Sequence, residues 1–164
     1  MAQSVRPLAP VAIVFLVLLG VLWWLFDGYT ARRANPNQAL ATSAGEAGTV
    51  RLTRSRDGHY RAPGTINGES VDFLVDTGAS VIALPAGVAE RIGLARGARI
   101  TVPTAAGPSR AYRTRLDRVV VGSIAVDDVR AAIVPAMGGD QILLGMSFLG
   151  HLDMQFRNGE LLLR

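Results

Sequence analysis

The segment with the clearest chemistry is Asp76-Thr-Gly78, which directly follows an apolar run. An apolar strand that ends in this way brings a carboxylate into a tight turn, and Gly78 permits backbone conformations that are closed to other residues. The hydroxyls of Thr77 and Ser80 are placed to hold the carboxylate and the turn. An ordinary turn after a strand needs only an aspartate and a glycine, so this motif alone leaves both interpretations open.

A second segment, Gln141–Leu149, is an apolar run that contains Gly145 and continues into a short predicted helix. Taken alone, it predicts a buried strand followed by a helix. Together, the two segments resemble the aspartic proteases of the retropepsin type. In that family a strand carrying Asp-Thr-Gly is crossed by a later apolar strand that ends in glycine, and the next helix packs beneath the active site. The resemblance assigns Leu144 and Gly145 to this psi-shaped crossing.

Over about residues 57–164 the chain resembles the bacterial members of that family, which combine one membrane span with a single-lobe domain. The Leu116–Gly122 and Phe156–Leu162 segments follow the same pattern. Viral members usually have arginine at the position of Met146, so we expect no viral-type ion-pair network here. The resemblance implies that Asp76 is catalytic, that Thr77, Gly78, Ala79 and Ser80 support its loop, and that a flap of Thr104, Ala105, Ala106, Gly107 and Pro108 closes over the substrate.

Aspartic proteolysis needs two carboxylates that act on one water, of which one takes a proton from the water and the other donates to the peptide carbonyl oxygen. The chain has one Asp-Thr-Gly. Asp72 is predicted on the opposite strand face from Phe73, the Asp127-Asp128 pair in a turn, and Asp117 and Asp153 between strands or at their edges.

We therefore expect the second carboxylate to come from a second copy of the chain, because a two-fold contact places Asp76 against Asp76. Like charges about 3 Å apart cannot both be ionised, so the dyad is expected to keep one proton over a mildly acidic range. The resemblance implies that Thr77 links the two loops across the dyad and that Ser80 supports the carboxylate. The predicted partners are thus a second copy and a protein or peptide substrate.

The substrate is predicted to bind in an extended form along strand edges. Ile82, Leu84 and Val102 are candidates for pocket walls, and equally for plain core. The alternative to an enzyme is a catalytically silent dimeric β-module that binds extended peptides through the same cleft. New termini in casein would indicate the enzyme, and binding without cleavage would indicate the module.

The N-terminal part of the sequence predicts a membrane anchor. Residues 7–26 carry no charge, and at about 1.5 Å per residue a helix of this length crosses the hydrocarbon core of a bilayer. A cleaved signal peptide is the alternative, but no small-residue cleavage site follows the apolar run. The predicted organisation is a tail at 1–6, a transmembrane helix at 7–26, a flexible linker at 27–48 and one domain at 49–164.

That domain is predicted to be all-β, because short apolar runs recur between turn signals. Asn67-Gly68 and Asn158-Gly159 predict two tight hairpins, and a third is expected around Thr104–Pro108. Two short helices are expected, at Ala86–Ile92 and Met146–Gly150. The resemblance narrows this fold class to the single-lobe retropepsin-like acid protease barrel.

Composition excludes several other classes of function. All 17 basic residues are arginine and no basic run occurs, so we predict no nucleic-acid partner. The absence of cysteine excludes disulfides, cysteine-bound metals and a thiol nucleophile. His59 and His151 lack partners at ligand spacing, so we expect no metal and no cofactor. The flanking charges do not orient the membrane segment, whereas the resemblance implies the bacterial inner membrane with a periplasmic domain.

Overall fold

The computed structural model describes residues 9–38, 48–104 and 107–164, with the described side chains of the first helix limited to residues 12–26. The chain divides into two units, Met1–Ala34 and Asn35–Arg164. The folded domain therefore begins at Asn35, earlier than the predicted boundary at residue 49.

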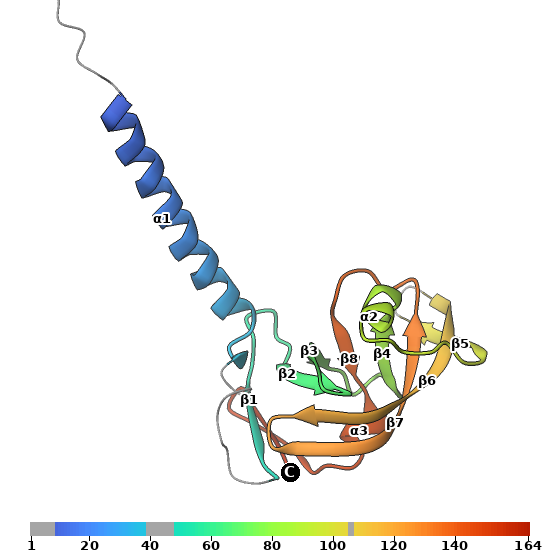
Figure 1. Cartoon of the computed structure of the whole chain (residues 1–164). Coiled ribbons are helices and arrows are strands. Elements are labelled where there is room, and N and C mark those ends of the chain that lie inside the picture. Colours follow the sequence, from blue (N-terminus) through green and yellow to red (C-terminus); the bar gives the residue numbers. More distant parts are fainter. Residues whose placement is uncertain (1–8, 39–47, 105–106) are drawn as a thin grey trace, which may run out of the picture. The chain divides into compact units, whose positions relative to one another are not determined.

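The first unit contains helix α1 (Ala9–Ala34; Figure 1). Its described side chains are all exposed. The helix continues beyond the predicted end at Phe26 because no proline follows until Pro36. A proline disfavours helical geometry in the residue before it, which explains why the helix stops just before Asn35. Residues 27–34 are therefore helical, where the sequence predicted a flexible linker. Across the residues that the structure describes, no helix has both the length and the apolar character that a membrane crossing requires, so the predicted span is not confirmed.

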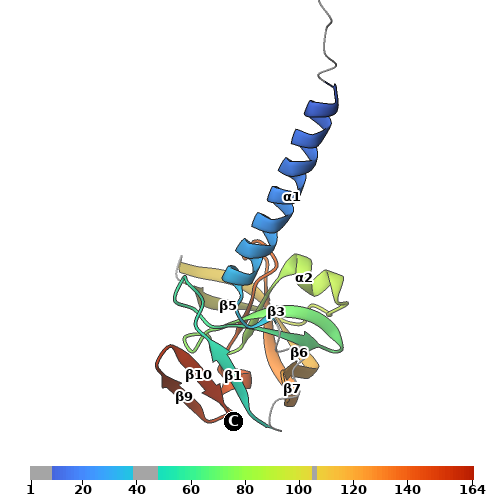
Figure 2. The ribbon, with the colours of Figure 1, turned by 90° about the vertical axis from the view of Figure 1, so that its left-hand side faces the viewer.

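In the second unit, the described strands form a seven-stranded and a three-stranded sheet. The larger sheet has the order β2-β3-β8-β4-β7-β6-β5, and β2 also pairs with β6, so six of its strands close into a barrel. The smaller sheet has the order β1-β10-β9 (Figure 2). The strands are β1 (Val50–Thr53), β2 (Arg61–Ile66), β3 (Glu69–Val75), β4 (Ile82–Pro85), β5 (Arg99–Thr104), β6 (Gly107–Val121), β7 (Ile124–Val134), β8 (Ile142–Leu144), β9 (Met154–Arg157) and β10 (Glu160–Leu163).

The predicted hairpins are confirmed. Asn67 and Gly68 have φ angles of 52° and 89°, and Asn158 and Gly159 have φ angles of 51° and 79°. Two consecutive positive φ angles match the right-handed twist of the flanking strands, which is why Asn-Gly is favoured at this turn. The β5–β6 hairpin is also present, with Thr104 paired to Gly107, but the predicted flap residues Ala105 and Ala106 lie outside the described residues.

The predicted turn at Asp127-Asp128 is wrong, because both residues lie within β7, and Asp117 lies within β6. Ion pairs across the two strands explain how Asp127 and Asp128 are accommodated. Arg118 on β6 binds Asp127, directly opposite in the register, with 2.9 Å between Nη1 and Oδ1. Cross-strand pairs of opposite charge stabilise a sheet, so polar residues at this point need not end the strand.

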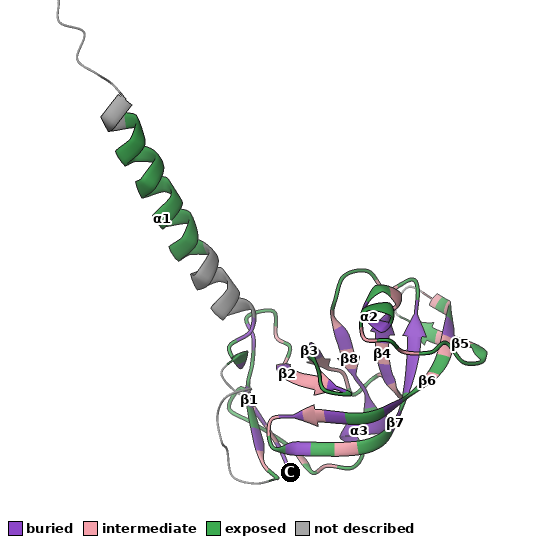
Figure 3. Ribbon diagram, viewed as in Figure 1, coloured by how far each residue is buried: buried purple, intermediate pink, exposed green. Residues whose placement is uncertain are grey.

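The core is shared by the barrel and the smaller sheet. Leu52 on β1 and Leu161 on β10 are fully buried in the same cluster as Phe73 on β3. Figure 3 shows buried stretches that alternate with intermediate and exposed ones along strands such as β6. Two short helices, α2 (Ala86–Arg91) and α3 (Met146–Leu149), appear at the predicted places, and Phe148 of α3 is fully buried in this core.

Asn37 holds the start of the second unit against the first two strands. It is 5 % exposed, its Oδ1 accepts a hydrogen bond from Thr53 N (2.7 Å), and its Nδ2 donates to Thr53 O (2.9 Å) and to Arg61 O (2.8 Å). The amide thus satisfies three backbone groups, as a neighbouring strand would. Asn35 extends the contact, since its Nδ2 donates to Asp72. At this point too the structure differs from the predicted flexible linker.

We expect Asn37→Ala to lower the free energy of unfolding by about 2 kcal/mol, because three partly buried backbone groups lose their partner. Urea denaturation followed by circular dichroism would measure it. The matched control is Gln38→Ala at the exposed neighbouring position, which should change the free energy by less than about 0.5 kcal/mol. Equal effects of the two substitutions would show that Asn37 does not hold this segment.

Candidate active site

The site is built where β8 passes between β3 and β4 (Figure 1). β8 runs parallel to β3, with Val75 opposite Leu144, and antiparallel to β4, with Ala83 opposite Leu143. β3 ends at Val75, so Asp76 is the first residue beyond a strand that is held on both sides. The predicted crossing of the Asp-Thr-Gly strand by a later apolar-Gly strand is present.

The loop after β3 is fixed by a set of short hydrogen bonds. Asp76 N donates to Leu144 O (3.1 Å), and Ala79 N donates to Asp76 O (3.2 Å). Gly78 N donates to Asp76 Oδ1 at 2.9 Å, so the backbone orients the carboxylate. Ser80 lines the same cleft as Asp76, and its predicted support of the carboxylate stays a prediction.

Space requires glycine at Gly145, and at Gly78 an added side chain would crowd the carboxylate. The φ of Gly78 is not in the positive range, so the expected reason for this glycine is wrong. A Cβ at Gly78 would instead lie 3.2 Å from Asp76 Oδ1. At Gly145 a Cβ would lie 2.3 Å from Val81 O and 2.6 Å from Ala79 O. Met146 N donates to the same Ala79 O at 2.8 Å, so the crossing packs backbone directly on backbone.

A cleft with a volume of about 510 Å³ opens in front of the Asp76 carboxylate. Asp76 is the one acidic residue among the described residues that line it, and its side chain is partly exposed. The rest of the lining is mainly apolar. It consists of Gly78, Ala79, Ser80, Val81 and Ala83 from the loop and β4, Val102, Pro103 and Thr104 from β5, and Ala132, Val134, Met137 and Leu143.

The β5–β6 hairpin forms one wall of this cleft, in the place predicted for the flap. Val102, Pro103 and Thr104 line the cleft, and the Thr104 hydroxyl donates to Gly107 O at 2.6 Å. Val102 is therefore a pocket wall, whereas Ile82 and Leu84 are fully buried core residues. On β4 it is the alternate residue Ala83, with Val81 just before the strand, that faces the cleft.

Ser147 is a buried residue of the site that the sequence did not reveal. Its Oγ accepts a hydrogen bond from Ile82 N (3.1 Å) and donates to Arg130 O (2.7 Å). It therefore ties helix α3 to β4 and β7 directly behind the Asp76 loop. A serine in the first turn of a short predicted helix gives no sign of such a contact, because both partners are backbone groups that lie far away in the sequence.

Comparison with known proteins agrees with this geometry. The family described as gag-polyprotein putative aspartyl protease matches residues 62–151, more than half of the chain. A crystal structure of a retropepsin-like aspartic protease from Rickettsia conorii superposes with a TM-score of 0.61 at 31 % identity, over 72 % of this chain and 91 % of that one. The chain belongs to the bacterial retropepsin-like aspartic protease family. The predicted fold class, the barrel of this family, is thereby confirmed.

Two sequence relatives of this retropepsin-like chain are uncharacterized proteins. One, from Sinorhizobium sp., is 39 % identical over 129 residues, which is 76 % of this chain and 55 % of the relative. The other, from Rickettsia prowazekii, is 32 % identical over 151 residues, which is 87 % of this chain and 63 % of the relative. The chain thus spans less than two thirds of the length of both relatives.

Proposed function

We propose that the chain is an aspartic endopeptidase whose active centre forms from two copies. The observation that carries the proposal is the Asp76 carboxylate, oriented by Gly78 N and held by the β3–β8 crossing at the mouth of an apolar cleft. Membership of the family supports the class of reaction. In the reaction, one Asp76 takes a proton from the attacking water, and the second donates a proton to the carbonyl oxygen of the peptide.

The need for a second copy follows from the number of carboxylates. Two are required, and among the described lining residues of the cleft Asp76 is the single acid. A two-fold contact supplies the second one from the same position of the partner. In this arrangement Thr77, which is exposed beside Asp76, lies where the two loops meet and links them.

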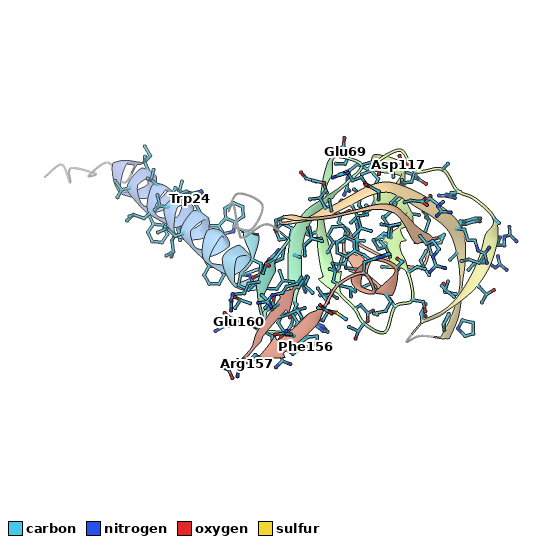
Figure 4. All side chains as sticks on the ribbon, turned by 90° about the horizontal axis from the view of Figure 1, so that it is seen from below. Trp24, Glu69, Asp117, Phe156, Arg157 and Glu160 are labelled. Carbon is cyan, nitrogen blue, oxygen red and sulfur yellow. The ribbon has the colours of Figure 1, made fainter. Side chains whose placement is uncertain are left out.

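The free edge of β9 is the surface that we propose for this contact. Among the described strands β9 pairs with β10 alone, so its other edge is open. Phe156 on β9 is 58 % exposed, although its ring lies 5.7 Å from that of Tyr60. Figure 4 shows Phe156 and Arg157 on the β9–β10 hairpin, outside the barrel. An open strand edge with an exposed aromatic side chain is suited to pairing with another chain.

We expect Phe156→Asp to raise the dissociation constant of the dimer by about 30-fold or more, as the loss of a central aromatic contact does at many interfaces. The fold should be unaffected, because most of the ring is solvent-exposed. Analytical ultracentrifugation of the full chain in detergent would measure the effect. The control is Ala125→Asp, which adds the same charge at an exposed position of β7. An unchanged dissociation constant for Phe156→Asp would remove β9 from the proposed interface.

The lining of the cleft supports a substrate bound in extended form with apolar side chains. Ala83, Val102, Val134 and Leu143 offer apolar surface beside the carboxylate. A pocket with one charged group in an apolar surround favours neutral, hydrophobic residues next to the scissile bond. The β5–β6 hairpin is proposed to close over the bound peptide and to exclude water.

We further propose that the α1 unit anchors the enzyme in the bacterial inner membrane, with the protease domain on the periplasmic side. Support comes from the uncharged run at 7–26 and from the exposure of large apolar side chains such as Leu16, Trp23 and Trp24. The test is alkaline extraction of membranes after expression. The full chain should remain with the lipid and a fragment 35–164 should not; release of the full chain would contradict the anchor.

The proposed activity is tested by incubating the purified full chain with casein at acidic and neutral pH. New peptide termini, identified by mass spectrometry, are expected with the wild type and not with Asp76→Asn. Binding of casein without new termini at any pH would contradict the activity and favour a silent peptide-binding module. New termini with both proteins would remove Asp76 from the mechanism.

A further inference from the structure

A second cavity, the arginine recess, adjoins the cleft that contains Asp76. It has a volume of about 920 Å³ and shares Ser80, Val81 and Val102 with that cleft. A peptide extended along the cleft therefore reaches the recess without a break in the surface. The apolar residues of its lining, here called the floor, are Val81, Leu94, Ala95, Ile100, Val102 and Ala131.

The rim of this recess is strongly basic. Four arginines line it, together with one acid, Asp117; the arginines are Arg96, Arg113, Arg115 and Arg130. Arg96 is engaged, since its Nη2 lies 2.6 Å from Glu90 Oε1 and its guanidinium lies 5.5 Å from the centre of the Tyr112 ring. Arg115 is engaged as well, through two hydrogen bonds of 2.5 Å to the carboxylate of Asp128.

Arg113 and Arg130 remain available to bind an anion. Neither forms an ion pair within the part of the chain that the structure describes, and both are exposed. Arg113 and Arg130 lie on the same face of the β6–β7 pair. Arg115 is directly opposite Arg130 in the register, and Arg113, two residues before Arg115 on β6, is the diagonal neighbour of Arg130. Like charges directly opposite each other destabilise a sheet. Asp128 already offsets the charge of Arg115, so the charges that a bound anion would neutralise are those of Arg113 and Arg130.

The backbone around both arginines is held firmly. Gly97 N donates to Arg113 O and Arg113 N donates to Ala98 O, both at 2.9 Å, which ties the loop after α2 to β6. The Ser147 hydroxyl, itself buried, donates to Arg130 O at 2.7 Å. The two side chains therefore start from fixed points, as a specific binding site requires.

We propose that the arginine recess binds an acidic side chain of the peptide substrate, at a position several residues away from the scissile bond. The inference rests on the proposed function and adds a substrate class to it. The guanidinium groups of Arg113 and Arg130 supply planar donors that match a carboxylate, and the apolar floor receives the stem of a glutamate. A substrate would thus combine neutral residues at the cleavage point with an acid to one side.

The test uses the full chain and a set of decapeptides with two central apolar residues and alanine flanks, each carrying glutamate or glutamine at one flank position. At one position the wild type should cleave the glutamate peptide with a kcat/KM about 10-fold higher than its glutamine twin. The difference should reside in KM, because the contact is remote from the reacting atoms. It should also shrink as salt is raised.

The double variant Arg113→Gln/Arg130→Gln should reduce the ratio of kcat/KM between the glutamate and the glutamine peptide to less than about 2. The matched control, Arg56→Gln/Arg164→Gln, removes two exposed arginine charges outside the recess and should keep the preference. The charge-reversal variant Arg113→Glu/Arg130→Glu should prefer an arginine peptide at the same position. If the wild type cleaves the glutamate and glutamine peptides equally at every position, the proposed role of the recess is contradicted, while the proposed protease activity is supported.

A readout without turnover separates this proposal from the proposed function. Binding of the same fluorescein-labelled peptides to Asp76→Asn is followed by anisotropy, and the glutamate peptide should bind about 10-fold more tightly than its twin. Suppose that the wild type cleaves no peptide, but the difference in affinity is present and is lost with Arg113→Gln/Arg130→Gln. The proposed protease activity would then be contradicted, and the proposed binding of an acidic side chain in the recess would be supported. If the two peptides bind with equal affinity, the proposed binding of an acidic side chain in the recess is contradicted, whether or not the wild type cleaves peptides.

Discussion

Replacing Asp76 by asparagine is expected to lower kcat/KM for peptide cleavage by about 10³-fold or more while the chain stays folded. In the proposed mechanism, the substitution removes the group that takes the proton from water from both halves of the dyad at once. The structure also predicts that the fold survives, because Asp76 Oδ1 accepts its hydrogen bond from Gly78 N and an asparagine oxygen can accept the same bond. Single-turnover cleavage of a fluorogenic peptide would measure the loss, with circular dichroism to check the fold.

The matched control for this substitution is Asp140→Asn. Asp140 is exposed outside the cleft and pairs with Arg91 on the surface, with 3.0 Å between Oδ1 and Nη1. Exposed pairs of this kind contribute little, so its activity should equal that of the wild type. Retained cleavage by Asp76→Asn, or an equal loss in both variants, would contradict the assignment of Asp76.

Gly145→Ala is expected to lower the free energy of unfolding by about 3 kcal/mol and to abolish most of the activity. The added Cβ would meet Val81 O at 2.3 Å and Ala79 O at 2.6 Å. Both contacts are with backbone, which cannot rotate aside as a side chain can. Relief requires the loop that carries Asp76 to move away from β8. In the proposed dimer this movement would separate the Asp76 carboxylate from that of the second copy. Urea denaturation and the peptide assay would measure the two effects.

Gly138→Ala is the control for the crossing. Gly138 lies in the loop before β8, where a Cβ would meet no atom within 4 Å, and its φ is not in the positive range. Its unfolding free energy should stay within about 0.5 kcal/mol of the wild type. If Gly145→Ala were as stable as Gly138→Ala, the backbone contact at the crossing would not be required for the fold.

Much of the fold could be predicted from the sequence because its strongest signals are local. Asn67-Gly68 and Asn158-Gly159 fix their turns by the backbone preferences of two residues alone. The candidate catalytic loop could be predicted because Asp76-Thr-Gly78 combines a carboxylate with a turn at the end of an apolar strand. The crossing by β8 needed two distant segments, and it was the family pattern that joined them.

What the sequence could not reveal depends on contacts between distant parts of the chain. On β4 both faces are apolar, so the sequence shows no alternation of polar and apolar residues. It therefore could not distinguish the core residues Ile82 and Leu84 from Ala83, which faces the cleft. Asn37 and Ser147 act on backbone groups of remote strands, and no local pattern marks such contacts. The arginine recess arises because the β6–β7 register places Arg115 opposite Arg130, and arginines spread evenly along the sequence gave no sign of it.

The requirement for two copies is tested most directly by mixing wild-type and Asp76→Asn chains in equal amounts at a fixed total concentration. Exchange of partners would be verified with mass-tagged chains. If each active centre needs Asp76 from both copies, random pairing leaves about one quarter of the pairs active, so activity should fall to about one quarter of that of the wild type alone. Activity at one half, in proportion to the wild-type chains present, would show that one chain carries a complete active centre and would contradict the account.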